Sequence, residues 1–442
     1  MKIALCKSHF FGPVSGADEA LVTYAVSLHR AGHDVAVVLL FKPTDNDQFF
    51  QRLRNAGVTV LHVIDRSIVF TIMRGLRNML SSFLLLLLLI PRSETRLRKI
   101  WQILIDLISR AHYGNCRDYF AQSHHDVLHV FTPDSGAALM IRAGREAGIP
   151  VLYHELGTPN HLKALSGYYR RLERVLPLCS EVAALSPLLA KQWSERFGFL
   201  SSVSVLPLIS EDSENLLLPT FLIQRSKSET VFGFAARIEE GKGPFLLIDA
   251  LLKLQPRNLE IRIRFAGTGP ALQQIKALVR QHGVDESCEF VGAYSGNVGR
   301  SAFMRTLDVF VLPSYAEGTS KSIIEAMAHG LPIITTAVGG SPDLITRDVG
   351  ILVEPNNSEA LAEAMHALTD PTVGKQMGKA ARKRYEELFA PTAVLPMLVD
   401  TYSRLASDGN GTTNGHHPWA MRSDEKELAL AVAGCSSSTA CE

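Results

Sequence analysis

Two glutamates, Glu317 and Glu325, are separated by seven residues and enclose a short loop that leads into a predicted helix. The loop carries a glycine and several small polar residues, so its backbone N–H groups are accessible beside the start of the helix. Such a corner favours anions, and both carboxylates can face one bound molecule, one from the loop and one from the helix. The spacing therefore indicates a binding site for a ligand with an anionic part.

A second interpretation explains the same residues without a ligand. Ser322 and Glu325 have the spacing of a capping box, in which the glutamate closes the start of the helix. Glu317 could likewise be a solvated loop residue. This stretch alone leaves both interpretations open.

Two short apolar segments flank the helix and would position the loop. Residues 308–312 end at Pro313, and residues 332–336 are rich in isoleucine and threonine, so both are predicted to be buried strands. Gly330 supplies the end of the helix between them. A strand, loop, helix and strand in this order make the two strands parallel, and the loop then opens at the carboxyl edge of the sheet, where open α/β folds bind ligands.

The motif resembles the donor-sugar site of the retaining glycosyltransferases of family 4, which have the GT-B fold. The similarity includes the residues Gly330-Leu331-Pro332 and covers about residues 1–405, most strongly 231–340. It implies an α/β protein of two Rossmann-like domains that face each other across a cleft.

The resemblance also assigns roles around the donor. It implies that Glu317 holds hydroxyls of the donor sugar, that Glu325 holds the ribose hydroxyls, and that the residues after Glu317 complete the donor loop. These are Gly318, Thr319 and Ser320.

Two cations stand where family members bind the donor diphosphate. Arg237 and Lys242 follow a predicted strand, residues 231–235, and precede a predicted helix, residues 244–254. Two positive charges and a helix N-terminus can neutralise a departing diphosphate, so the resemblance implies catalysis without a metal ion.

The N-terminal half opens as a β-α-β unit with a small-residue turn after its first strand. Family members carry a glycine pair in this turn, and Gly16 matches one of them, whereas Ser15 replaces the other. His154 lies at the carboxyl end of a later predicted strand, and the resemblance implies that it lines the cleft near the transferred sugar, with Glu155 as an orienting partner. A structural histidine is the alternative.

Length and composition agree with two large α/β domains. At 442 residues the chain exceeds one ordinary core. We expect an acceptor-side domain in residues 1–210, a donor domain in 211–389, a helix over 390–406 that crosses back to the first domain, and a disordered tail in 407–442.

Charge and cysteine usage limit the possible functions. Lys and Arg number 45 against 44 Asp and Glu, so nothing global indicates nucleic-acid binding. The six cysteines show no paired spacing, which favours a reducing compartment over a zinc site or a disulfide framework. Asp45-Asn46-Asp47 is predicted to be a solvated helix start and not a metal site, because a polar loop separates it from the preceding strand.

One segment, residues 66–99, combines a leucine run with seven cations. The run is too short to cross a bilayer core of ~30 Å, which needs ~20 apolar residues. It is either a buried core helix or a basic helix that lies on anionic lipid. The second alternative would suit a lipid-linked acceptor and a cytoplasmic enzyme at the inner face of the membrane.

These observations predict a retaining glycosyltransferase of polysaccharide biosynthesis. It would move a sugar from a UDP- or GDP-type donor to a glycan or lipid-linked acceptor. An epimerase of the same fold, or a protein that only binds nucleotide sugars, are the two alternatives.

The basic segment gives a first testable expectation. Replacing Arg74 and Arg77 by Glu should release the protein from anionic vesicles, because each cation near such a surface contributes about 1 kcal/mol. Co-sedimentation with vesicles measures this, and neutral vesicles provide the control. Unchanged sedimentation would identify the leucine run as core.

Overall fold

The computed structural model describes residues 1–10, 15–64, 113–131, 136–158, 172–198, 203–210, 229–294 and 296–407. They form two compact units. Unit 1 contains Met1–Ala184, Gln192–Leu206 and the described residues from Met397 to Ser407, and unit 2 contains Leu185–Lys191 and Pro207–Pro396. The expectation of two Rossmann-like α/β domains is confirmed. The basic segment 66–99, the connector 211–228 and the tail from 408 lie outside the described residues.

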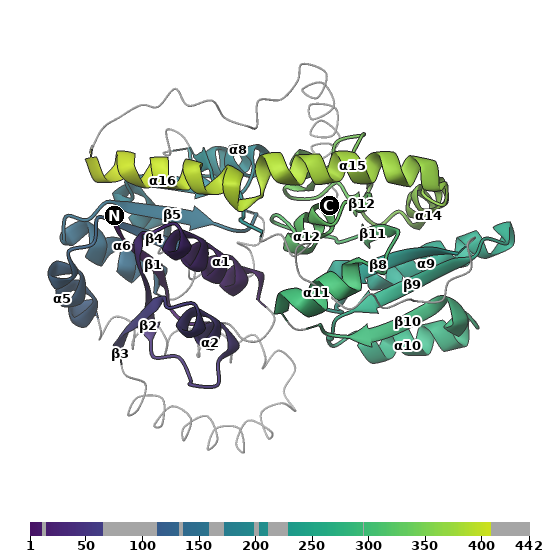
Figure 1. The fold of residues 1–442 in the computed structure, drawn as a ribbon, viewed down its shortest axis with the longest axis horizontal. Helices are drawn as coiled ribbons and strands as arrows, with labels where there is room; N and C mark the ends of the chain where they lie inside the picture. Colours follow the sequence, from purple (N-terminus) through teal and green to yellow (C-terminus); the bar gives the residue numbers. More distant parts are fainter. Residues whose placement is uncertain are drawn as a thin grey trace, which may run out of the picture. The chain divides into compact units, whose positions relative to one another are not determined.

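Unit 1 is built on a parallel sheet in the order β3-β2-β1-β4-β5-β6-β7 (Figure 1). Its strands are β1 (Lys2–Lys7), β2 (Asp34–Phe41), β3 (Thr59–Ile64), β4 (Val127–Phe131), β5 (Val151–Glu155), β6 (Glu181–Ala184) and β7 (Ser204–Val205). The strand order reverses between β1 and β4. Their carboxyl ends are therefore the switch point at which doubly wound sheets bind ligands.

Helices follow the strands of unit 1 in the order that a doubly wound fold requires. They are α1 (Gly16–Arg30), α2 (Gln48–Asn55), α5 (Tyr113–Ser123), α6 (Ala137–Glu146) and the second half of α8 (Pro187–Arg196), from Gln192 on, with a 3₁₀ turn, η2 (Leu176–Leu178). Gly16 starts α1 directly after the loop from β1. The sequence thus places the predicted small-residue turn at the switch point of this unit.

Unit 2 has a second parallel sheet, in the order β10-β9-β8-β11-β12-β13. Its strands are β8 (Thr230–Ala235), β9 (Ile261–Ala266), β10 (Cys288–Gly292), β11 (Val309–Leu312), β12 (Ile333–Thr336) and β13 (Gly350–Val353). Here the order reverses between β8 and β11. The loops that carry Lys242 and Glu317 follow these two strands.

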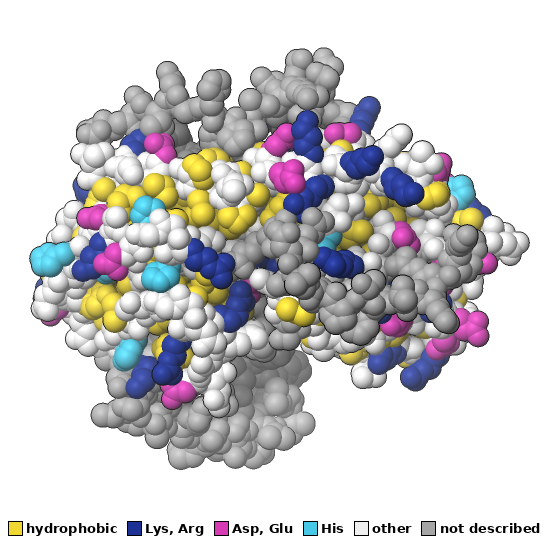
Figure 2. All heavy atoms as spheres, in the orientation of Figure 1, with side chains coloured by type: hydrophobic (Ala, Val, Ile, Leu, Met, Phe, Trp, Pro, Cys, Tyr) yellow, Lys and Arg dark blue, Asp and Glu magenta, His cyan; other side chains and the backbone are white. Residues whose placement is uncertain are grey.

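The helices of unit 2 cover both faces of this sheet (Figure 1). They are α9 (Pro244–Leu254), α10 (Leu272–Gln281), α11 (Gly296–Met304), α12 (Lys321–Ala328), α13 (Ser341–Leu344), α14 (Ser358–Ala367) and α15 (Pro371–Leu388), with 3₁₀ turns η3 (Glu240–Lys242), η4 (Gln255–Arg257) and η5 (Asp285–Ser287). Helix α15 packs on α12 and presents mixed charges to solvent, as the blue and magenta side chains over it show (Figure 2). Helix α16 (Pro391–Ser407) follows and contains Pro396.

Most predicted elements differ from the observed ones by one to three residues at their ends, because apolar runs and glycine or proline stops define them. The elements that were not expected include β3 and α11. Strand β3 is largely exposed at the edge of its sheet, and α11 begins with glycine and asparagine, which are weak helix formers. Among the described residues, no helix is both long and apolar enough to span a bilayer.

A cluster of aromatic and histidine rings fills the core of unit 1. His129 stacks on His154 at a centroid distance of 5.2 Å, and Nδ1 of His154 lies 3.2 Å from Nε2 of His129. The Tyr402 hydroxyl is hydrogen-bonded to Nδ1 of His129 at 2.5 Å, which attaches α16 to the sheet. All three side chains are completely buried.

Burial shifts the pKa values of the two histidines and of a neighbouring glutamate in this core. Loss of hydration lowers the pKa of His154 to about 3 and lowers that of His129 well below its usual range. Burial also raises the pKa of the neighbouring Glu155 to about 7, although Tyr153 and two backbone N–H groups hydrogen-bond its carboxylate. The native core therefore keeps both histidines neutral.

Acid should destabilise unit 1 through these histidines. Below pH 6.5 an unfolded His154 binds a proton that the folded one does not, so the free energy of unfolding should fall by about 1.4 kcal/mol per pH unit until pH 3. Glu155 acts in the opposite direction between pH 7 and 4.5, since its folded form retains the proton. The combined effect of the two histidines is larger than that of the one carboxyl group. Calorimetry should therefore give a lower free energy of unfolding at pH 5 than at pH 7.

The variant His154→Phe should reduce this acid-dependent loss, because it removes one of the groups that take up a proton on unfolding. Replacement of the exposed His282 by Gln serves as the control and should leave the loss unchanged. Equal acid sensitivity of His154→Phe and wild type would contradict the assignment.

Candidate functional site

The loop after β8 carries both predicted diphosphate ligands and bends back against β11. Gly243 adopts a φ of 71°, and a Cβ atom there would lie 1.9 Å from the carbonyl oxygen of Pro313. Tyr315 N donates to the carbonyl of Gly241 at 2.9 Å. Only glycine permits this approach, which brings η3 to the carboxyl end of β11.

Lys242 and Glu317 meet at this switch point. Nζ of Lys242 lies 2.8 Å from Oε1 of Glu317, and the Ser314 hydroxyl donates to the same oxygen at 2.8 Å. The glutamate side chain is 10% exposed and the lysine side chain 25%. Two residues that are 75 positions apart in the sequence thus form one ion pair that a ligand can reach.

Arg237 occupies the same loop but has a different partner. Its Nε lies 3.3 Å from the carboxylate of Glu239, and its side chain is 58% exposed. The backbone around it is fixed, since Ile238 N donates to the carbonyl of Thr268 at 2.9 Å and Gly267 packs against the carbonyl of Ala236. The Gly-x-Gly at 267–269 therefore has a packing role. The backbone of Arg237 is thus held in place while most of its side chain is exposed to solvent.

The loop from Glu317 to Ser320 rests on a glycine pair after β12. Gly340 N donates to the carbonyl of Gly318 at 2.7 Å, and a Cβ atom on Gly339 would lie 1.8 Å from the carbonyl oxygen of Glu317. Thr319 is buried, and its hydroxyl has no hydrogen-bond partner among the described residues. Ser320 is the N-cap residue of α12, so the loop delivers its backbone to the start of this helix.

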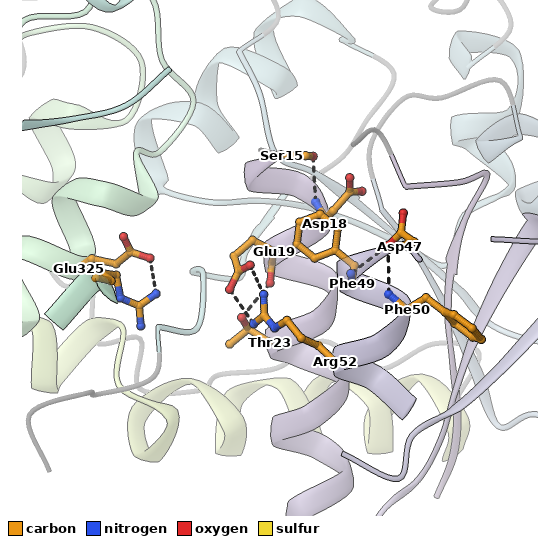
Figure 3. Close-up of polar contacts among 10 residues, drawn as sticks. Ser15, Asp18, Glu19, Thr23, Asp47, Phe49, Phe50, Arg52 and Glu325 are labelled. Carbon is orange, nitrogen blue, oxygen red and sulfur yellow. Dashed lines mark hydrogen bonds and ion pairs between the residues drawn. The ribbon is translucent and has the colours of Figure 1, made fainter. Parts of the chain in front are cut away.

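Glu325 does not close a capping box, and that interpretation is wrong. The N-cap is Ser320, which places Glu325 at the fifth helical position, beyond the third position that a capping box uses. Its Oε1 instead accepts from Nη1 of Arg300 in α11 at 2.7 Å, the dashed contact at Glu325 in Figure 3. Both side chains are nearly buried, Arg300 at 7% and Glu325 at 8% exposed.

In unit 1 the predicted turn forms the start of α1. Ser15 is the N-cap residue, and its hydroxyl accepts from Asp18 N at 3.2 Å (Figure 3). A Cβ atom on Gly16 would meet nothing within 4 Å, so packing within the described residues does not require glycine there. Asp18 forms a completely buried ion pair with Lys7 at the end of β1.

His154 lies within β5 and not after it, with its ring in the aromatic core. Glu155 is the last residue of the strand, and its carboxylate accepts from the Tyr153 hydroxyl at 2.7 Å and from Gly157 N at 2.9 Å. Glu155 therefore holds the loop after β5. The expected contact of His154 with a sugar stays a prediction.

Asp47 begins α2, as the sequence predicts. Its carboxylate accepts from the backbone N–H groups of Phe49 and Phe50 at 2.9 and 3.1 Å, which makes it an N-cap (Figure 3). The Asp-Asn-Asp triplet thus has a structural explanation. Beside it, Arg52 of α2 pairs with Glu19 of α1 and joins the two helices.

The structure adds three features to the site that sequence reasoning missed. They are Arg300, which pairs with Glu325, the hydroxyl of Ser314, which supports Glu317, and the packing of Gly339 and Gly340 under the loop. The -Gly-Gly- turn was visible in the sequence, but the contact it makes depends on tertiary structure. Nothing in the sequence indicated that Arg300 pairs with Glu325, because helix α11, which carries Arg300, was not expected.

A comparison with protein families finds a match in the second half of the chain. Residues 222–384 match the family described as glycosyl transferases group 1. The matched range contains Lys242, Glu317, Glu325 and Arg300, and it therefore covers the whole arrangement at the switch point of unit 2.

Individual relatives are also glycosyltransferases by name. The chain is 35% identical over 191 residues to D-inositol 3-phosphate glycosyltransferase of Kribbella flavida, which covers 40% of this chain and 45% of that protein. It is 27% identical over 309 residues to a Bacillus subtilis protein named as the teichuronic acid biosynthesis glycosyltransferase TuaC, which covers 69% of this chain and 71% of that protein. The chain thus spans less than half of the first of these relatives.

The fold agrees with solved structures over almost the whole chain. HepE of Anabaena, solved in complex with UDP and glucose, has a TM-score of 0.64 at 18% identity and covers 91% of this chain and 99% of its own. Together with the two parallel sheets and their switch points, this similarity gives the two-domain GT-B fold. Residues 222–384 therefore match the model of the glycosyl transferases group 1 family, within a chain that has the GT-B fold.

Proposed function

We propose that the chain is a retaining glycosyltransferase that moves a sugar from a UDP- or GDP-type donor to a glycan or lipid-linked acceptor without a metal ion. The observation that carries the proposal is the ion pair between Lys242 and Glu317 at the switch point of unit 2. The ammonium group of Lys242 could bind phosphate oxygens, and the carboxylate of Glu317 could accept hydrogen bonds from sugar hydroxyls. Both lie beside the N-terminus of α12.

The diphosphate would replace Glu317 as the partner of Lys242. An ammonium group forms charge-assisted hydrogen bonds with phosphate oxygens, and the backbone N–H groups at the start of α12 add their dipole. Arg237, which is largely exposed, would turn from Glu239 to the same anion. Fixed positive charge then stabilises the leaving group as its negative charge develops.

Release of Lys242 would free the Glu317 carboxylate for hydroxyls of the donor sugar. Ser314 keeps this carboxylate in place through its own hydrogen bond, so the glutamate does not have to reorient. Gly318, Thr319 and Ser320 would line the donor with backbone N–H groups and the buried Thr319 hydroxyl. Glu325, one turn into α12, would accept from the ribose hydroxyls.

The reaction would follow a front-face course. The acceptor hydroxyl oxygen bonds to the anomeric carbon on the side from which the diphosphate leaves, the bond to the diphosphate oxygen breaks, and that oxygen takes the hydroxyl proton. The product retains the anomeric configuration of the donor, and no protein side chain acts as nucleophile.

Relatives support the class of acceptor. TuaC is named for teichuronic acid biosynthesis, and a glycan acceptor in polysaccharide biosynthesis agrees with this name. Gly16 would leave room for an acceptor beside the start of α1, since no described residue lies within 4 Å of its Cβ position. Association with the inner face of an anionic membrane would bring a lipid-linked acceptor to the enzyme.

Replacing Lys242 by Met should weaken binding of the nucleoside diphosphate at least about tenfold and leave binding of the free nucleoside nearly unchanged, because only phosphate contacts are lost. Isothermal titration measures both. Lys242→Met alone leaves the Glu317 carboxylate without its cation and should lower the stability of the protein. The double variant Lys242→Met with Glu317→Gln should recover this stability but not the affinity for the nucleoside diphosphate.

The matched control is Lys253→Met, which removes an ion-paired lysine of α9 whose partner is Glu359 at 2.5 Å. It should keep wild-type affinity for both compounds. If Lys242→Met lowered the affinity for nucleoside and diphosphate alike, the lysine would have a general structural role and the proposed contact would be rejected.

A panel of nucleotide sugars with a membrane extract tests the function itself. Transfer should occur with a chelator present, and NMR of the product should show the donor's anomeric configuration. Interconversion of the donor without acceptor would identify an epimerase, and binding without turnover would identify a sugar-nucleotide-binding protein. Loss of transfer with the chelator would reject metal-independent catalysis.

A further inference from the structure

Helix α11 is joined to α12 by two polar contacts made by adjacent residues. Arg300 pairs with Glu325 at 2.7 Å, and the Ser301 hydroxyl lies 3.1 Å from Nε2 of His329. The other ring nitrogen of His329 lies 2.8 Å from the carbonyl oxygen of Glu325. Both contacts thus converge on one residue, Glu325, through its side chain and its backbone.

Stability alone does not explain the ion pair. Burying a guanidinium and a carboxylate removes their hydration, and a well-packed apolar pair of similar volume is often equally stable or more stable. Nε of Arg300 is also buried and has no hydrogen-bond partner among the described residues, which adds a further desolvation cost. An apolar pair would avoid both costs, so a role of these two charges in ligand binding is worth testing.

We propose that Arg300 is a positioning residue for recognition of the nucleoside part of the donor. It holds Oε1 of Glu325 and thereby fixes the rotamer in which this carboxylate accepts from the ribose hydroxyls. An ionised carboxylate offers about four acceptor positions, so a bond to Arg300 is compatible with further bonds to hydroxyls. This inference rests on the proposed function and adds to it a residue that selects ribonucleotides.

The physical basis is preorganisation. A free glutamate side chain loses rotamer freedom when it binds a ligand, whereas Arg300 has already restricted Glu325 in the unbound protein. A guanidinium is suited to this because its planar group of donors fixes an angle as well as a distance, which the ammonium of lysine does not. The fully ordered pair then distinguishes ligands by the hydroxyls they carry.

The test compares two ligands that differ only in the ribose. One is the nucleoside diphosphate that the wild type binds, UDP or GDP, and the other is its 2′,3′-dideoxy analogue. In isothermal titration, Arg300→Met should bind the ribonucleotide about tenfold more weakly than wild type and the dideoxy analogue with unchanged affinity. The preference for ribose should nearly disappear.

A double-mutant cycle with Glu325 distinguishes positioning from an independent contact. If Arg300 acts through Glu325, then Arg300→Met in the Glu325→Gln background should cause no further loss of ribonucleotide affinity. Additive losses would mean that Arg300 binds the nucleotide by itself and would overturn the positioning role. Arg300→Lys, which keeps the charge without the planar group, should restore part of the preference and also serves if the methionine variant folds poorly.

The matched control is Arg262→Met at the amino end of β9, whose ion-pair partner is Glu229 at 2.8 Å. It removes another arginine–glutamate pair, which is more exposed (39% and 16%), at the amino end of a strand of the same unit, and it should leave both affinities unchanged. Equal weakening of the two ligands by Arg300→Met, or no weakening, would overturn the inference while the proposed function stands. A wild-type protein that binds neither UDP nor GDP would instead reject the proposed function and this inference with it.

Discussion

The ion pair between Lys242 and Glu317 is the interaction on which the arrangement of unit 2 depends. It joins two loops that leave the sheet at its switch point, one after β8 and one after β11. A lysine held beside a carboxylate keeps its charge localised at the edge of the sheet, and the nearby start of α12 adds a second positive potential. The pair therefore holds a cation and a carboxylate side by side at the carboxyl end of the sheet.

Close backbone contacts make this pairing possible. Gly243 lies against the carbonyl of Pro313, and Gly339 lies against the carbonyl of Glu317, both in conformations with positive φ. Any side chain at either position would push a loop away from its neighbour and separate Lys242 from Glu317. The two glycines therefore determine how closely the side chains of Lys242 and Glu317 approach each other.

The sequence predicted the elements and the order of the charges well, because strands and helices in this fold are continuous apolar runs with clear stops. It also placed Lys242 and Glu317 on loops at the carboxyl edge, which follows from parallel topology alone. The sequence did not predict contacts between residues that only the folded chain brings together. Ser322 and Glu325 have the spacing of a capping box, but the helix starts two residues earlier than such a box requires. The partner of Glu325 is Arg300, which lies on a helix whose first residues are weak helix formers.

The switch points of the two units use ion pairs in opposite ways. In unit 1 Lys7 and Asp18 are completely buried, so their pairing fixes α1 against β1 and neither charge can be exchanged for a ligand without a large desolvation change. In unit 2 the pair of Lys242 and Glu317 also lies at the switch point, but it is partly exposed, so its lysine stays accessible to solvent. The two units thus share a topology but differ in the burial of the lysine at the switch point, because Lys7 is completely buried whereas the side chain of Lys242 is 25% exposed.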